Sequence, residues 1–160
     1  MTRRIGLLGA VALLLAACSP HAADGKPAPA TAAATHAVSG LPVVPVSVIS
    51  GGKRQTFRAE TARNQAEQAR GLMFRTAMGD DEGMIFPYDP PRNVSFWMKN
   101  TVIPLDIIYI GADGGILNIA KAVPYSEEPL PSAGAAKAVL EINGGRAAAL
   151  GIKPGDRVEW

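Results

Sequence analysis

The chain has 160 residues, of which 48% are hydrophobic and 19% are charged, and its formal net charge at pH 7 is +2. Its 16 Lys and Arg residues nearly balance its 14 Asp and Glu residues, so we expect no nucleic-acid-binding surface. A single cysteine excludes an intrachain disulfide. Both histidines, His21 and His36, precede residue 43, so the rest of the chain has no means to build a His-dependent triad, a thiol nucleophile or a conventional zinc site. We expect no cofactor and no bound metal.

Residues 1–18 have the pattern of a lipoprotein signal peptide. Two arginines precede an apolar stretch over 5–15, which is too short to span a bilayer comfortably. The run Leu15-Ala16-Ala17-Cys18 resembles the bacterial lipobox, in which the cysteine is lipidated and becomes the first residue of the mature protein. The alternative is an ordinary secretory signal with an incidental cysteine. Ser19 resembles the residue found in lipoproteins sorted to the outer membrane, so we expect an exported, periplasmic protein, anchored to a membrane through Cys18, with the outer membrane favoured over the inner.

Residues 19–42 are predicted to form a disordered tether. Ala, Pro, Thr and Ser dominate this stretch, which has almost no large apolar side chain before Leu41 and cannot bury enough surface to offset its ordering entropy. Residues 43–160 then form one domain, whose size suits a single hydrophobic core.

The pattern along this domain is mainly β. Short runs rich in β-branched residues predict strands over 43–49, 55–61, 84–88, 93–99, 105–110, 116–123, 136–142 and 156–160. Asn64 with Glu67 three residues later predicts a capping box for a short helix that ends near Gly71. Asn143 is expected to cap a second short helix that ends at Gly151. We therefore predict a compact, single-domain β-sandwich or barrel-like fold with two short helices, and loops over 74–82 and 124–134.

The segment around Trp97 is chemically dense. If 93–99 is a strand, Trp97 and Lys99 share one face and Phe96 and Met98 the other. The structural interpretation is that Trp97 covers a secondary core and Lys99 packs on it through a cation–π contact or its stem. The methionines could gather as thioether ligands for Cu(I), but Met84 and Met98 fall on predicted core faces, so we expect packing instead.

A second polar cluster follows, with Asn100 and Thr101 in a predicted loop and Asp106 in an apolar strand. A carboxylate there must find donors or a cation, and Lys99, Arg75 or loop N–H groups are candidates. One interpretation is a structural network that fixes the loop. Another is a ligand site in which Lys99 or Arg75 meets an anionic group while Asp106 orients it. The third is catalysis by a carboxylate pair, Glu82 and Asp106, as in glycoside hydrolysis.

Several motifs together resemble the domain of unknown function 192 family. They occur in consistent order between Phe57 and Val158, and they are Arg70-Gly71-Leu72-Met73-Phe74-Arg75, Asp81-Glu82-Gly83-Met84-Ile85-Phe86, Ser95-Phe96-Trp97-Met98-Lys99-Asn100-Thr101 with Ile103-Pro104-Leu105-Asp106, Val139-Leu140-Glu141, and Gly151-Ile152-Lys153-Pro154-Gly155-Asp156. The resemblance implies a compact, mostly β domain that often follows an export signal, and it implies no established activity. Many members have cysteines where this chain has Tyr125 and Leu130, so we expect no disulfide or metal in that loop.

Two functional hypotheses follow. The first is a non-catalytic envelope module that binds a small ligand or a partner protein. Its candidate binding residues are Arg75, Trp97, Lys99, Asn100, Thr101 and Asp106. The second is a hydrolase that acts on an envelope glycan or polymer through Glu82, Asp106 and Lys99. The lack of histidine after residue 42 favours the first.

Overall fold

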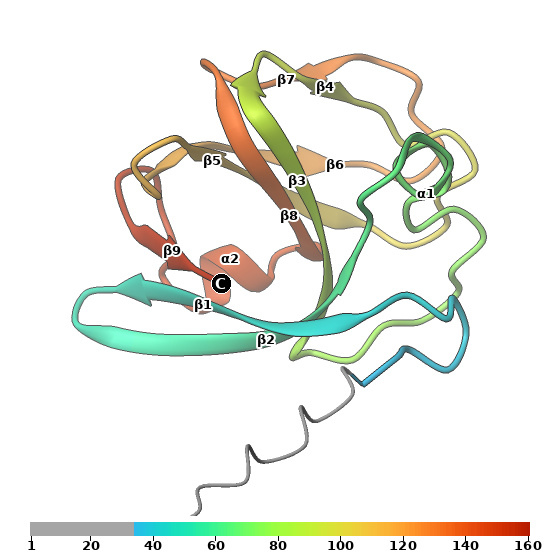
Figure 1. Ribbon diagram of the computed structural model, residues 1–160, viewed down its shortest axis with the longest axis horizontal. Coiled ribbons are helices and arrows are strands. Elements are labelled where there is room, and N and C mark those ends of the chain that lie inside the picture. Colours follow the sequence, from blue (N-terminus) through green and yellow to red (C-terminus); the bar gives the residue numbers. More distant parts are fainter. Residues whose placement is uncertain (1–33) are drawn as a thin grey trace, which may run out of the picture. The chain divides into compact units, whose positions relative to one another are not determined.

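The computed structural model describes residues 34–160, so the predicted signal peptide and Cys18 lie outside the described residues (Figure 1). The strands are β1 (Val43–Ser50), β2 (Lys53–Thr61), β3 (Glu82–Arg92), β4 (Ser95–Phe96), β5 (Leu105–Gly111), β6 (Ile116–Ala122), β7 (Leu130–Pro131), β8 (Ala136–Asn143) and β9 (Arg157–Glu159), and the helices are α1 (Gln65–Arg70) and α2 (Arg146–Ala149). None of the helices in 34–160 has the length and apolar character needed to cross a membrane.

Seven strands form one curled sheet in the order β6-β5-β8-β3-β2-β1-β9, and β4 pairs with β7 in a separate two-stranded sheet. Neighbours in the large sheet are antiparallel except β2 and β3, which run parallel and are connected through α1. The two edge strands approach each other at a single bridge between Gly115 and Arg157. The predicted mainly β fold with two short helices is confirmed, and the sheet curls without closing into a barrel (Figure 1).

Both faces of the large sheet are buried, and the central strand β8 shows this directly. Leu140 and Ile142 point into one hydrophobic cluster, whereas Val139 points into a second cluster on the opposite face. All seven residues of β5 are buried, and apart from Asp106 the strand is a continuous apolar run, as expected for a strand that is covered on both faces. The second cluster contains Met84 and Met98, the two methionines predicted to belong to the core.

Helix α1 begins where the sequence predicted. The Asn64 side chain accepts a hydrogen bond from the backbone N–H of Glu67 at 2.9 Å, and the Glu67 carboxylate accepts one from the N–H of Asn64 at 3.1 Å. This reciprocal pair is the capping box. The helix ends at Gly71, whose φ of 47° lies in the left-handed region that favours glycine.

The predicted strand over 93–99 is wrong in extent, because only Ser95–Phe96 pair as a strand. Beyond Phe96 the backbone bonds to loops instead, with the N–H of Met98 donating to the carbonyl of Ser126 at 2.7 Å. Asn100 then adopts a φ of 55°, which turns the chain.

The predicted cap of the second helix is also wrong. Gly145 occupies the N-cap position of α2 and provides no side-chain hydrogen bond. The Asn143 amide instead donates to the carbonyls of Met78 and Gly79 at 2.8 and 3.1 Å, which ties the loop before β3 to the end of β8.

The ordered fold begins before the predicted boundary at residue 43. Thr35 forms a β-bridge with Pro42, and the N–H of Val43 donates to the carbonyl of Ala34 at 2.7 Å. His36 and Leu41 are joined by a backbone hydrogen bond of 2.9 Å across the turn between them. Composition alone does not reveal this segment, because its contacts to the domain are made by a few polar side chains and by a single large apolar one, Leu41.

Candidate functional site

Trp97 and its neighbours lie on one exposed segment. The Trp97 side chain is 48% exposed, and Lys99 Nζ lies 5.1 Å from the centroid of its ring, which is the cation–π contact that the sequence predicted. Asn100 is exposed and its amide contacts the sulfur of Met73 at 3.9 Å. Thr101 is buried, and its hydroxyl donates to the carbonyl of Lys99 at 3.3 Å.

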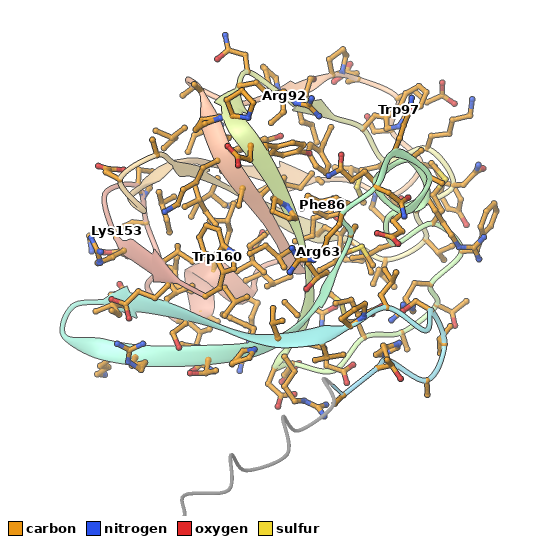
Figure 2. All side chains as sticks on the ribbon, in the orientation of Figure 1. Arg63, Phe86, Arg92, Trp97, Lys153 and Trp160 are labelled. Carbon is orange, nitrogen blue, oxygen red and sulfur yellow. The ribbon has the colours of Figure 1, made fainter. Side chains whose placement is uncertain are left out.

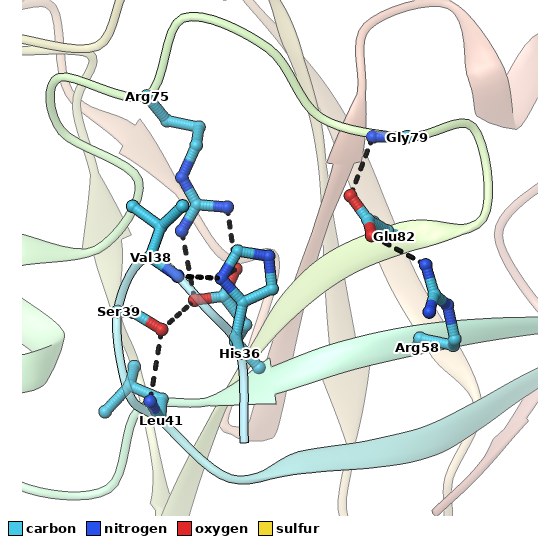
Figure 3. Close-up of polar contacts among 9 residues, drawn as sticks. His36, Val38, Ser39, Leu41, Arg58, Arg75, Gly79 and Glu82 are labelled. Atoms are coloured by element: carbon cyan, nitrogen blue, oxygen red, sulfur yellow. Dashed lines mark hydrogen bonds and ion pairs between the residues drawn. The ribbon is translucent and has the colours of Figure 1, made fainter. Parts of the chain in front are cut away.

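Arg75 lies elsewhere and is committed to a buried ion pair. Its guanidinium contacts both oxygens of Glu60, at 2.8 and 3.0 Å, and both side chains are nearly inaccessible to solvent (Figure 3). The hydroxyl of Ser39 donates to the same carboxylate, and His36 Nδ1 lies 3.5 Å from it. This bidentate arrangement holds the 34–42 segment on the domain and neutralises the charge of Arg75, which weakens its attraction for an anionic ligand.

The structure separates the two carboxylates of the hydrolase hypothesis. Asp106 is buried, and its Oδ2 accepts a hydrogen bond of 2.8 Å from the N–H of Ala147, so it caps α2 from inside the fold. Glu82 bonds to the guanidinium of Arg58 at 2.7 Å and to the N–H of Gly79 at 2.8 Å (Figure 3).

The strand register shows that the side chains of Asp106 and Glu82 project from opposite faces of the large sheet. Asp106 and Gly83 both pair with Ile142, so they occupy equivalent positions across the sheet. Glu82 is one residue before Gly83 and therefore projects from the other face. The arrangement does not place an acid and a base on either side of one substrate.

The unexpected feature is Glu141. It lies on β8 between Met84 of β3 and Ile107 of β5, and only 4% of its surface is exposed. Its carboxyl makes no hydrogen bond and no ion pair with any of residues 34–160. Burial without a counter-charge disfavours the ionised form and raises the pKa of Glu141 to about 8.

Glu141 lines a small pocket of about 40 Å³. The other side chains that shape the pocket come from α1, from β3 and from the segment that holds Trp97, and they include Gln68, Phe86, Phe96, Trp97 and Thr101. Two rings of this set, Phe86 and Phe96, pack edge to face with centroids 5.1 Å apart. Of the binding residues predicted from sequence, the pocket therefore brings together Trp97 and Thr101.

A larger groove of about 540 Å³ adjoins this pocket and shares Arg70, Gly71 and Met73 with it. Its remaining walls are mixed, with apolar side chains such as Val38, Leu41 and Phe74 and with the charged side chains of Glu67 and Arg75, so this groove, and not the small pocket, contains the predicted Arg75. The two cavities together place a small pocket with polar lining groups beside a larger groove with apolar ones, a combination found in small-molecule sites.

Three loops around these cavities have strained backbones that are held together by hydrogen bonds. Phe74, Asn100 and Tyr125 have φ values of 63°, 55° and 62°, which asparagine tolerates but aromatic residues rarely adopt. The N–H of Phe74 donates to the carbonyl of Asn100 at 2.9 Å, and that of Tyr125 donates to the carbonyl of Thr101 at 3.1 Å. Strain of this kind persists only where the surroundings fix it, and it concentrates at binding sites.

A family model described as "Uncharacterized ACR", DUF192, matches residues 46–160. The chain belongs to the DUF192 family. Among solved structures, it is similar to a protein of unknown function from Novosphingobium aromaticivorans, with 64% identity and a TM-score of 0.79 over 82% of this chain and 94% of the other. It is also similar to a proposed transcription regulator from Sinorhizobium meliloti, with 39% identity and a TM-score of 0.72 over 74% of this chain and 94% of the other. No curated protein matches the chain.

Two residues of this DUF192 domain escaped the sequence-based site prediction. Glu141 stands in the run Ala138-Val139-Leu140-Glu141-Ile142, where it reads as one polar position in a strand. Glu141 could have been predicted by the same pattern that identified Asp106, which is an acid in an otherwise apolar strand. Glu60 was harder to predict, because it lies near the end of a strand that contains several other polar residues.

Proposed function

We propose that the protein is a non-catalytic binding module of the cell envelope, which receives a small ligand at the pocket over Glu141. The observation that carries this proposal is a buried carboxyl that lines a cavity and has no partner among residues 34–160. Buried polar groups in folded proteins are nearly always hydrogen-bonded, so a carboxyl that faces a cavity without a protein partner is available to a bound molecule. The acids that a hydrolase would need, Asp106 and Glu82, are engaged in structural contacts.

The surroundings of the pocket favour binding to a preformed site. Trp97 and Thr101 belong to a segment whose backbone bonds to two other loops, so their positions are fixed before a ligand arrives. The near balance of charges in the chain does not favour DNA as the ligand, although one relative is described as a proposed transcription regulator.

The binding proposal has a matched control within the chain, because two tryptophans each make a cation–π contact with a lysine. Lys99 lies 5.1 Å from Trp97, and Lys137 lies 4.8 Å from Trp160, which projects from a different part of the surface (Figure 2). We expect native mass spectrometry after incubation with a small-molecule envelope extract to show a bound mass on the wild type and on Trp160→Ala. The same mass should be lost from Trp97→Ala. Equal retention by both variants, or no bound mass on the wild type, would contradict the proposal.

Export and lipid anchoring are part of the same proposal and rest on the sequence of residues 1–18. A lipidated Cys18 would hold the binding domain at the membrane surface through the segment that follows it. We expect the wild type in the membrane fraction of cells, and Cys18→Ser as an unprocessed or released protein. Unchanged fractionation and unchanged precursor processing in Cys18→Ser would contradict the lipid anchor and leave ligand binding untouched.

A further inference from the structure

We propose that the pocket over Glu141 selects small molecules that carry a primary ammonium group, and that this group binds directly to the Glu141 carboxylate. This inference rests on the proposed binding function and names the chemical class of its ligand. It follows from four features of the pocket, which are its acceptors, its aromatic walls, its size and its buried acid.

The polar groups that line the pocket are rich in acceptors. The Gln68 amide nitrogen donates to the carbonyls of Ala62 and Pro87, each at 3.3 Å, and no donor among residues 34–160 bonds its oxygen. The Thr101 hydroxyl uses its proton on the carbonyl of Lys99, so its lone pairs stay available. Together with Glu141, these side chains offer three acceptor groups, and a primary ammonium group has three N–H donors and no acceptor.

Aromatic rings form much of the remaining wall. Phe86, Phe96 and Trp97 line the cavity, and the faces of such rings attract cations. The protein itself shows this attraction, because the ammonium group of Lys99 lies over Trp97. An anionic ligand group would instead be repelled by Glu141 once its carboxyl is ionised, so the ionised pocket disfavours carboxylates and phosphates.

The volumes fit a ligand with a small charged head and a larger apolar body. A volume of about 40 Å³ holds a group close to the size of one water molecule, which is also the size of an ammonium head. The adjoining groove of about 540 Å³ would receive the rest of the molecule against Leu41, Met73 and Phe74. A bound water or a neutral hydrogen-bond acceptor could also occupy the small pocket, and the experiment below separates these occupants.

Binding of an ammonium group would be coupled to loss of a proton. Below pH 8 the free carboxyl of Glu141 is protonated because burial raises its pKa to about 8, and it must ionise before it can pair with a cation. When the protonated Glu141 carboxyl and the ligand ammonium group form an ion pair, the carboxyl releases one proton to solvent. Affinity should therefore increase about tenfold per pH unit between pH 6 and 8 and level off above that range.

Other titratable groups near Glu141 do not produce this dependence. Tyr88 on β3 and Tyr109 on β5 both face Glu141, and burial raises the pKa of Tyr88 to about 12 and raises that of Tyr109 as well, so both stay neutral. The exposed Arg70 of α1 lines the pocket, and the exposed Lys99 lies over the ring of Trp97, so both are cations near the site. Their repulsion lowers the affinity for an ammonium group, and water screens it.

The test uses n-butylamine as the probe, with n-butanol, butyrate and tetramethylammonium as matched controls, measured by calorimetry on the full mature chain at pH 6, 7 and 8. We expect n-butylamine to bind more tightly than each control, with proton release and the stated pH dependence. Glu141→Gln should weaken its binding by roughly tenfold or more, since it removes a buried charge partner. Lys99→Ala should bind it as tightly as the wild type or more tightly, because a competing cation is gone.

Equal binding of n-butanol, or unchanged n-butylamine affinity in Glu141→Gln, would overturn the proposal and indicate a neutral ligand or water in the pocket. If Glu141→Gln fails to fold, the carboxyl carbon of Glu141 in the wild type can be followed by nuclear magnetic resonance. The amine should shift that signal to the ionised position at pH 7, and an unchanged signal would be equally decisive against the proposal. An extract ligand that depends on Trp97, without any binding of amines, would refute the ammonium class and leave the binding function standing. If neither an extract ligand nor an amine binds, both the ammonium class and the binding function are refuted.

Discussion

Two acids on neighbouring strands show how the surroundings of a residue decide its role. Asp106 on β5 pairs in register with Ile142, and Glu141 on β8 pairs with Ile107, so the acids sit one position apart and face opposite sides of the sheet. Asp106 meets the N–H of Ala147 and becomes a helix cap. Glu141 meets apolar side chains and a cavity, so it remains a neutral acid at moderate pH.

The first prediction is that Glu141 destabilises the free protein at alkaline pH. Its pKa is 4.5 when unfolded and about 8 when folded, so the folded state binds more protons between these values and stability falls as pH rises. We expect Glu141→Gln to match the wild type near pH 4.5 and to exceed its stability increasingly toward pH 8. The difference should grow by up to about 1.4 kcal/mol per pH unit, measured by urea unfolding.

Glu60 provides the control for this prediction, because it is a second buried acid with a full set of partners. Glu60→Gln breaks the bidentate pair with Arg75 and leaves a buried guanidinium without its counter-charge. It should destabilise the protein by about 3 kcal/mol, which is the opposite sign to Glu141→Gln at pH 8. A lower stability of Glu141→Gln than of the wild type at pH 8 would contradict our account of the pocket.

At the scale of elements, the sequence predicted what local chemistry determines. The capping box of Asn64 and Glu67, the β1–β2 hairpin and the mostly apolar β5 were all predictable from spacing and periodicity. The end of β4 was not, because the backbone of Met98 and Thr101 bonds to loops that are distant in sequence. The prediction that Trp97 and Lys99 share one face assumed a strand over 93–99. That strand ends at Phe96, but the two side chains still contact each other.

The packing of β3 against β8 gives the second prediction. An added Cβ at Gly83 would meet the carbonyl oxygen of Glu141 at 2.5 Å and the side chain of Ile142 at 3.2 Å, so two paired backbones would have to separate. Gly83→Ala should destabilise the domain by about 3 kcal/mol, although alanine normally suits a strand better than glycine. Gly134→Ala is the matched control, since its Cβ would meet only Leu117 at 3.9 Å, and we expect a change within about 0.5 kcal/mol. Equal unfolding midpoints for both variants would contradict the close approach.

At the scale of the molecule, one curled sheet separates two hydrophobic clusters, and the Glu141 pocket lies at the margin of the second. Family membership, the mainly β class and two of the pocket residues were within reach of the sequence. The pocket itself was not, because Gln68, Trp97 and Glu141 come from three segments that only the fold brings together. The start of the fold was also beyond reach, since the contacts of Ser39 and His36 with Glu60 leave no periodic pattern.

The third prediction follows from that early start and separates the two cavities. A chain that begins at Val43 lacks the Ser39 hydrogen bond to Glu60 and the packing of Leu41 on the second cluster, so it should be about 2 kcal/mol less stable than a chain that begins at Ala34. It also lacks one wall of the large groove, which includes Val38, but the small pocket draws no lining residue from 34–42. The truncated chain should therefore keep its affinity for n-butylamine under conditions where it stays folded, and it should bind a long-chain primary amine more weakly than the longer chain does. Calorimetry on both chains with both amines measures this. A parallel loss for the short and the long amine would show that the 34–42 segment supports the Glu141 pocket itself, rather than only the groove beside it.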